Sequence, residues 1–261
     1  MPGERRAVDL NADVGEASDD AGIAVERALL GMVTSAHIAC GGHAGNPASM
    51  RATVQAAMAC GVRVGAHPSY PDRDGFGRRP MEMSARALTA SLTGQIGALV
   101  EVATALGTTV RSVKAHGALY GEVARGSGAF DVLLDVVGEL CGPDTPLVLP
   151  SGAPALARAG ERGVAVHQEG FADRAYTADG GLVARRLPGS VFDDPATAAA
   201  QALGLAERGK ATAVDGTELS LPVDTLCVHG DTPNAPALVW AVRDALVAAG
   251  IAVAAPPAGH P

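Results

Sequence analysis

Short apolar runs alternate with longer alanine-rich stretches along most of the chain, a pattern typical of strands that alternate with helices. The apolar runs predict strands at 8–14, 34–39, 62–66, 110–115, 146–150, 164–169, 225–229 and 251–255. The alanine-rich stretches predict helices at 22–32, 47–61, 84–106, 129–141, 153–162, 195–208 and 235–249. Because each strand is followed by a helix in most of the chain, we expect the strands to form a parallel sheet.

Seven or eight strand and helix units over roughly 250 residues predict a TIM-like (β/α) barrel, although an open doubly wound sheet is an alternative. Segment 211–223 alternates around Asp215-Gly216, which is a hairpin turn signal, and we expect it to form a hairpin outside the barrel. Neither a linker nor a block of charge divides the chain. The prediction is therefore an α/β fold with a single barrel domain over residues 1–261.

Composition narrows the class of protein. A net charge of −8 with 3% aromatic residues argues against a nucleic-acid surface, which needs basic stripes and stacking rings. The chain has no apolar run long enough for a membrane span and no leader pattern, so we expect a soluble cytoplasmic protein with a small-molecule substrate. The four cysteines are widely spaced, which indicates reduced thiols rather than a metal knuckle.

Six of the seven histidines lie where a short apolar run passes into a loop. The first predicted strand indicates which way its polar side chains point. Asp9, Asn11 and Asp13 alternate with apolar residues, so they share one face of the strand. In a barrel the apolar face meets the helices, so this polar face is predicted to point inward. At the carboxyl ends of the strands, inward-facing groups open onto the catalytic face of such folds.

The same alternation predicts that one site is assembled from many loops. The residues expected to converge there are Asp13, Glu16, His43, His67, Lys114, His116, Glu169, Asp173, Arg174, His229 and Asp231. Lys114 and His116 share a strand face, which is costly unless an anion lies nearby. Some candidates have a structural alternative: His37 and His167 suit hydrogen-bonded core positions, and Asp231 before Pro233 suits a helix N-cap.

Two predicted loops exceed the usual connection length, and both contain arginine and glycine. Loop 67–83 contains Arg73, Arg78 and Arg79, and loop 170–191 contains Arg174, Arg185 and Arg186. Long loops of this kind are often lids or binding loops, and arginine suits a carboxylate or a phosphate. The short motifs of zincins, serine hydrolases and Rossmann nucleotide-binding proteins do not occur in a suitable context.

Six segments of the chain together resemble the LamB/YcsF family. They are DLNADVGE, HIACGGHAGNP, GAHPSYPDRDGFGRR, VKAHGALY, EGFADRAYTADGGLVARRLPGSV and CVHGDTPNA. The resemblance covers the chain to about residue 250 and implies an irregular (β/α) barrel related to glycoside hydrolases and polysaccharide deacetylases. It also implies an activity that opens 5-oxoproline to L-glutamate. The implied co-substrate is ATP, bound together with Mg²⁺, and the implied partners are subunits B and C of a 5-oxoprolinase complex.

This activity suggests roles for the candidate residues. We expect Asp13 or Glu16, with His67 or His116, to orient and deprotonate water, and Lys114 to stabilise developing negative charge. Glu169 completes the expected catalytic group. The residues expected to bind substrate or nucleotide are Asn11, His43, Arg73, Arg78, Asp173, Arg174, His229 and Asp231.

Two other functions fit the same residues. Asp13, His43 and His67, with His116, are candidate ligands for a divalent metal in an amidohydrolase or deacetylase that does not use ATP. Alternatively, the chain is a non-catalytic subunit that binds the substrate for its partners. Helix 235–249 is alanine-rich, which suits packing on the barrel and also suits a homo-oligomer or the partner complex.

Overall fold

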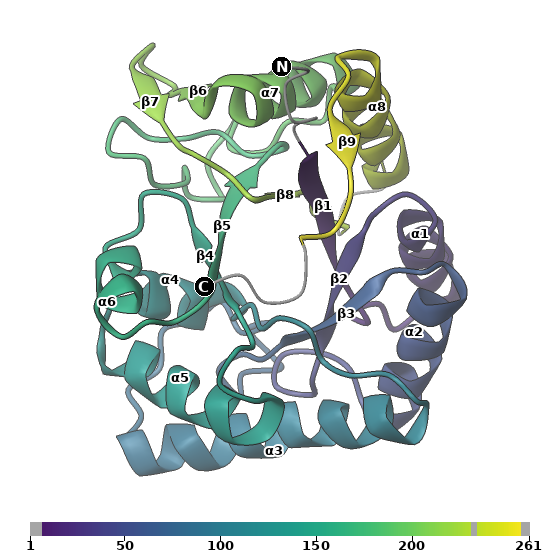
Figure 1. Ribbon diagram of the computed structural model, residues 1–261, viewed down its shortest axis with the longest axis vertical. Helices are drawn as coiled ribbons and strands as arrows, with labels where there is room; N and C mark the ends of the chain where they lie inside the picture. Colours follow the sequence, from purple (N-terminus) through teal and green to yellow (C-terminus); the bar gives the residue numbers. More distant parts are fainter. Residues whose placement is uncertain (1–6, 231–233, 257–261) are drawn as a thin grey trace, which may run out of the picture.

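A curled parallel sheet lies at the centre of the molecule (Figure 1). The computed structural model describes residues 7–230 and 234–256. The central strands are β1 (Ala7–Val14), β2 (Ser35–Ala39), β3 (Arg63–His67), β4 (Leu147–Pro150), β5 (Val166–Phe171) and β8 (Thr225–Cys227). Their order is β3-β2-β1-β8-β5-β4, and each neighbouring pair is parallel, which confirms the predicted parallel sheet.

Segment 111–116 closes this sheet into a barrel. Val113 forms parallel bridges to both β3 and β4, the two ends of the sheet. The amide of Lys114 donates to the carbonyl of Ala66 at 2.9 Å, and the amide of Val113 donates to the carbonyl of Pro146 at 3.0 Å. The ring is therefore complete, and the irregular TIM-like barrel is confirmed. The alternative of an open doubly wound sheet is wrong, because these hydrogen bonds join its two edges.

Helices surround the barrel on its outer side (Figure 1). They are α1 (Asp20–Leu30), α2 (Pro47–Ala59), α3 (Ala85–Ala105), α4 (Gly117–Ala124), α5 (Gly128–Cys141), α6 (Ala155–Glu161), α7 (Pro195–Arg208) and α8 (Ala235–Ala248). Local sequence explains several ends. Asn46 caps α2 by accepting from the Ala48 and Ser49 amides, and Gly209 ends α7 in the left-handed region, with φ +62.

Two predicted strands are less regular or shorter than expected, and one helix was not predicted. The predicted strand 110–115 makes only bridge contacts, and helix α4 follows it where no helix was predicted. The predicted strand 251–255 is the short β9 (Ala252–Val253), which pairs with the beginning of β1. The hairpin predicted in 211–223 is confirmed as β6 (Lys210–Thr212) and β7 (Glu218–Ser220), which pair antiparallel.

The two faces of β1 separate the core from the site. Leu10, Ala12 and Val14 are fully buried within the hydrophobic core. Asn11 and Asp13 alternate with them and contact Lys114, which comes from another part of the barrel wall. The prediction that the polar face points inward is therefore confirmed. None of the helices in the described ranges combines the length and apolar character that a membrane crossing requires.

Candidate active site

Lys114 is the central cation of the barrel interior. It is 2% exposed, and its Nζ lies 2.6 Å from Asp13 Oδ1 and 3.0 Å from Glu169 Oε1. It also donates to Asn11 Oδ1 at 2.9 Å. Burial lowers the pKa of Lys114, but Asp13 and other neighbouring groups outweigh burial and raise the pKa well above its usual value. Lys114 is therefore a buried ammonium ion. The sequence predicted an anion near it, and the structure places the carboxylates of Asp13 and Glu169 there.

Asp13 connects this ion pair to a cluster of histidines. Its Oδ2 lies 3.3 Å from His67 Nε2, while its Oδ1 contacts Lys114. Burial raises the pKa of Asp13, but His67 and Lys114 outweigh burial and hold the pKa well below its usual value. Asp13 is thus a carboxylate that faces a cation on one side and an imidazole on the other.

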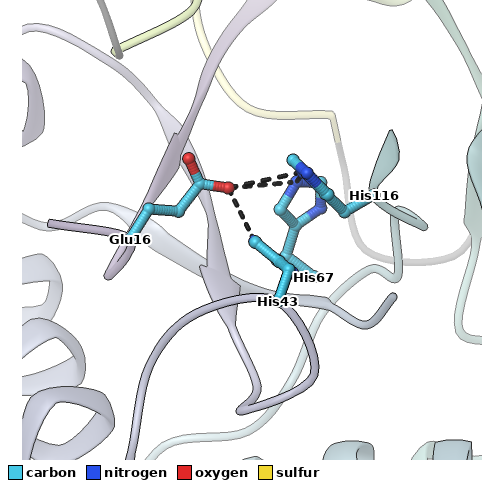
Figure 2. Close-up of side chains that lie close together, drawn as sticks. All are labelled: Glu16, His43, His67 and His116. Atoms are coloured by element: carbon cyan, nitrogen blue, oxygen red, sulfur yellow. Dashed lines mark hydrogen bonds and ion pairs between the residues drawn. The ribbon is translucent and has the colours of Figure 1, made fainter. Parts of the chain in front are cut away.

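The histidine cluster consists of His43, His67 and His116 around the carboxylate of Glu16 (Figure 2). Glu16 Oε1 lies 2.8 Å from His43 Nε2, 3.8 Å from His67 Nε2 and 3.4 Å from His116 Nδ1. His43 and His116 stack with their ring centroids 3.8 Å apart. Burial, followed by the charge of His67, lowers the pKa of both His43 and His116 to about 3, so these two imidazoles are neutral at neutral pH.

Two backbone carbonyls orient the imidazoles of this cluster. His67 Nδ1 lies 2.7 Å from the carbonyl oxygen of Lys114, and His116 Nε2 lies 2.9 Å from the carbonyl oxygen of Phe76. A carbonyl only accepts hydrogen bonds, so these ring nitrogens are the protonated donors. The other nitrogen of each ring then faces Glu16. Phe76 is the one described non-glycine residue with a positive φ, 53°, which places its carbonyl against His116.

Glu169 is held on both oxygens. Its Oε1 accepts from Asn11 Nδ2 at 3.1 Å as well as from Lys114, and its Oε2 accepts from the Tyr120 hydroxyl at 2.6 Å. Burial and then the Glu169 charge raise the pKa of Tyr120 well above its usual value, so the phenol keeps its proton. This arrangement leaves Glu169 as a fixed counter-ion of Lys114.

A second carboxylate and histidine pair lies at the carboxyl end of β8. His229 Nδ1 is 3.0 Å from Asp173 Oδ1, and the His229 amide donates to Asp173 Oδ2 at 2.9 Å. Burial lowers the pKa of His229, but the Asp173 charge outweighs burial and raises that pKa above its usual value. The Asp173 carboxylate therefore favours the imidazolium form of His229.

These groups surround two adjoining cavities. One, of about 290 Å³, is lined by Asp13, His67, Arg78, Lys114, Ala115, His116, Gly117, Tyr120, Glu169, Phe171, Arg174, Leu182, Arg185 and His229. The other, of about 370 Å³, is lined by Asp13, Glu16, Ala17, Asp19, Ala21, Gly22, Val25, Glu26, Phe76 and Gly230. Asp13 lines both cavities. They are of the size that small molecules occupy in proteins.

The predicted arginines occupy different places. Arg78 lines the first cavity, with its guanidinium 5.0 Å from the Phe76 ring centroid. Arg174 also lines it, but it is buried and donates to the carbonyls of Ser190 and Val183. Arg73 lies away from both cavities and donates to the carbonyls of loop 41–47, so its contacts tie two loops together. Asp231 lies outside the described residues.

His37 and His167, for which the sequence also allowed a core role, lie near other polar groups of the barrel. His37 Nε2 lies 3.1 Å from Ser112 Oγ, and its Nδ1 is 4.0 Å from Asp13 Oδ1. His167 lies at the other end of the barrel, where it lines a small cavity with Asp9 and Arg63. The structure thus groups Asn11, Asp13, Glu16, His43, His67, Lys114, His116 and Glu169, with Asp173 and His229 beside them.

Sequence reasoning missed Tyr120 as a site residue, and it missed the role of the Phe76 carbonyl. Tyr120 lies on the unpredicted helix α4, four residues after His116, so it returns to the same end of the barrel after one helical turn. Had α4 been predicted, this spacing would have indicated Tyr120. Arg185, one of the arginines of the predicted binding loop 170–191, lines the first cavity.

The fold and the site together define a (β/α) barrel with a polar, enzyme-type cavity at the carboxyl ends of its strands. The chain belongs to the LamB/YcsF family, which it matches over residues 8–260. It is 47% identical over 253 residues to the A subunit of the 5-oxoprolinase of Methylococcus capsulatus, a similarity that covers 96% of each chain.

Two solved structures place the fold. The chain is similar to the lactam utilization protein of Thermus thermophilus, with a TM-score of 0.87 and 41% identity over 95% of this chain and 99% of that one. It is also similar to a peptidoglycan N-acetylglucosamine deacetylase, with a TM-score of 0.51 and 13% identity over 98% of this chain and 88% of that one. The second likeness is one of fold alone, and it agrees with the predicted deacetylase-like barrel.

Proposed function

We propose that this protein is the A subunit of an ATP-dependent 5-oxoprolinase, which opens the lactam ring of 5-oxo-L-proline to give L-glutamate. The observation that carries the proposal is the 47% identity over 96% of each chain to a relative of that name. The likeness to a lactam utilization protein, at 41% identity, supports the same substrate class. The charged cavity around Lys114 supplies groups that suit a small anionic lactam.

ATP answers two needs of this reaction. A five-membered lactam is an unactivated amide that lies close in free energy to its open form, so ring opening needs both an activated carbonyl and a driving reaction. Transfer of the γ-phosphoryl group of ATP, carried with Mg²⁺, to the lactam oxygen gives ADP and a better electrophile. Water then adds to the ring carbon, and cleavage of the C–N bond opens the ring to an acyl phosphate. A second water displaces phosphate from this acyl phosphate and yields L-glutamate.

Lys114 stabilises the negative charge that develops on the lactam oxygen or on the phosphoryl group. Its position supports this role, because it lines the cavity and remains cationic in a buried site, where electrostatic stabilisation is strong. Glu169 and Tyr120 hold it in place. The ammonium ion is thus preorganised before substrate arrives.

The attacking water is oriented by Asp13 and His67, and Asp13 or Glu16 accepts its proton. Asp13 lines both cavities, and the carbonyl of Lys114 orients His67 so that its Nε2 lies 3.3 Å from Asp13 Oδ2 and 3.8 Å from Glu16 Oε1. Arg78 and Arg185 hold the substrate carboxylate or the nucleotide phosphates from the cavity wall. Partner subunits B and C complete the enzyme.

A pair of lysine variants tests the role of Lys114. The chain contains two lysines, Lys114 and Lys210, and the second lies on the outer hairpin with its side chain 44% exposed. In the complex reconstituted with subunits B and C, we expect Lys114→Met to reduce ATP-dependent glutamate release by at least ~100-fold, because it removes an electrostatic stabiliser. Lys210→Met is the matched control and should retain activity.

Circular dichroism and thermal unfolding of both variants separate a catalytic loss from a folding loss. Lys114→Arg provides a folded alternative that keeps the charge and changes its geometry. Turnover by folded Lys114→Met within ~10-fold of the wild type would remove Lys114 from the proposed mechanism.

Omission of each subunit in turn tests the function itself. Glutamate release from 5-oxoproline that requires ATP and all three subunits supports the proposal. Hydrolysis of a small amide by this chain without ATP would favour the metal-dependent amidohydrolase instead. Catalysis by the partners without this chain, with only the apparent KM raised, would favour a substrate-binding role for this chain.

A further inference from the structure

The cluster of Glu16, His43, His67 and His116 has the composition and geometry of a metal site. The four side chains come from the end of β1, the loop after β2, the end of β3 and the residue before α4, and they face one another (Figure 2). One potential ligand atom of each lies within 4.8 Å of the others. All three imidazoles are buried.

The hydrogen bonds of the cluster direct one nitrogen of each of two rings towards its centre. His67 Nδ1 and His116 Nε2 donate outward to the carbonyls of Lys114 and Phe76. His67 Nε2 and His116 Nδ1 therefore face each other at 3.0 Å. Such a contact needs a proton or a metal cation between the two nitrogens, because two imidazole lone pairs repel each other.

A metal explains the whole cluster better than a shared proton does. A proton between His67 Nε2 and His116 Nδ1 bridges only two atoms, whereas the four potential ligand atoms all lie within 4.8 Å of one another. A tetrahedral ion with bonds of roughly 2.0–2.2 Å places its ligand atoms about 3.4 Å apart. Four of the six distances between the ligand atoms are 2.8, 3.0, 3.4 and 3.8 Å, which bracket that value, and the other two are within 4.8 Å. The outward donation to carbonyls is the usual support for metal-binding histidines.

We propose that Glu16 Oε1, His43 Nε2, His67 Nε2 and His116 Nδ1 bind one divalent transition-metal ion. Three imidazoles and one carboxylate favour Zn²⁺, Co²⁺ or Fe²⁺ over Ca²⁺ and Mg²⁺, which prefer ligand sets built from oxygen. Such an ion would supply a Lewis acid beside Asp13, at the wall that the two cavities share. The site is separate from the Mg²⁺ that ATP carries.

The four ligands are not equivalent. His67 and His116 each have a carbonyl behind the ring, whereas the buried Nδ1 of His43 has no hydrogen-bond partner among the described residues. Loss of a supported ligand should therefore weaken binding more than loss of His43 does. The expected order of affinity for the metal is wild type, then His43→Ala, then His67→Ala and His116→Ala.

Metal binding by the full-length chain tests the proposal directly. The protein is purified without a histidine tag, stripped with a chelator and titrated with Zn²⁺ by calorimetry and with Co²⁺ by visible absorption. We expect one equivalent to bind, with the strong absorption of four-coordinate cobalt. His67→Ala and His116→Ala should weaken binding by at least ~100-fold, since loss of a ligand costs more than loss of the hydrogen bond that orients it. His167→Ala, at the other end of the barrel, is the matched control and should bind normally.

Far-UV circular dichroism of each metal-free variant shows whether it folds, and His116→Gln replaces any alanine variant that does not. If the wild type binds less than a stoichiometric amount of Zn²⁺ and Co²⁺, or if its ligand variants bind as it does, the proposal is wrong. Either result leaves the lactam-opening function standing, because subunit omission tests that function separately.

Discussion

At the scale of single residues, the ion pair of Asp173 and His229 shows how burial and charge compete. Burial raises the pKa of Asp173, but the charge of His229 outweighs burial and lowers it. Burial lowers the pKa of His229, but the charge of Asp173 outweighs burial and raises it. The pair thus carries two opposite charges beside the cavity. Its contribution to stability must depend on pH, because the pKa of each partner in the folded protein differs from its pKa in the unfolded chain.

The sign of that dependence follows from the two shifts. The raised pKa of His229 contributes stability below its unfolded value, about 6.5, and this contribution is lost as pH rises through the folded pKa. The lowered pKa of Asp173 contributes stability above its unfolded value, about 3.9, and this contribution is lost as pH falls through the folded pKa. The pair should therefore stabilise the fold most between about pH 4 and pH 6.5.

We expect Asp173→Asn to lower the free energy of unfolding by about 3 kcal/mol at pH 6, because it leaves the partly buried His229 without its counter-ion. The loss should become smaller as the pH rises through the folded pKa of His229. Urea unfolding of the wild type and the variant at pH 6, 7.5 and 9 measures this difference. A difference that is the same at all three values would show that the ion pair does not contribute as argued.

At the scale of elements, the turn into α4 determines where His116 lies. Gly117 has φ +58, and the amide of Ala118 donates to the carbonyl of Gly77 at 2.9 Å. A Cβ on Gly117 would lie 2.4 Å from that carbonyl oxygen. The long loop after β3 and the start of α4 are therefore joined at a point where only glycine fits.

Gly117→Ala should lower the free energy of unfolding by at least about 2 kcal/mol, since it adds a steric clash to a left-handed backbone. Because His116 is the preceding residue, the variant should also weaken any metal binding by the cluster. Gly94→Ala is the matched control: Gly94 lies on α3 with no heavy atom within 4 Å of its Cβ position, so this change should be neutral or stabilising by up to about 1 kcal/mol. Thermal unfolding measures both. Equal stability of the two variants would contradict the argument.

The elements that sequence patterns predicted well are those with strong local signals. Helix α2 begins at Pro47 and α7 ends at Arg208, as predicted, because Asn46 caps the first and Gly209 ends the second. Helix α4 was missed because it is only 8 residues long and contains glycine at both its first position and its interior. Its stability comes from packing of Leu119 and Val123 in the core, which no local pattern reveals.

At the scale of the whole molecule, closure of the barrel depends on segment 111–116, which makes isolated bridges rather than a regular strand ladder. Its amides nonetheless donate to carbonyls on both sides, from Arg111 to Val64 at 2.8 Å and from Val113 to Pro146 at 3.0 Å. Without these bonds the sheet would be open between β3 and β4. The segment also contains Lys114, so the same residues close the barrel and supply the buried cation of the site.

Hydrogen exchange tests this closure. We expect the amides of Val113 and Lys114 to exchange as slowly as those of Leu10 and Ala12 on β1, because all four are buried in the barrel wall. The amide of Asp215, at the exposed tip of the hairpin, provides a fast-exchanging reference. Rapid exchange at Val113 and Lys114 in the folded protein would mean that the barrel opens readily between β3 and β4.

The sequence alone determined the parallel α/β sheet, its inward polar face and the set of acids, imidazoles and Lys114 at the ends of the strands. These features follow from alternation of period two and from the geometry of parallel strands, both of which are local or repetitive. Only the tertiary structure decided which atoms meet. The tautomers of His67 and His116 depend on carbonyls from Lys114 and Phe76, and the separation of Arg73 from the cavity depends on loop contacts. Such contacts join residues far apart in the chain, so no local pattern encodes them.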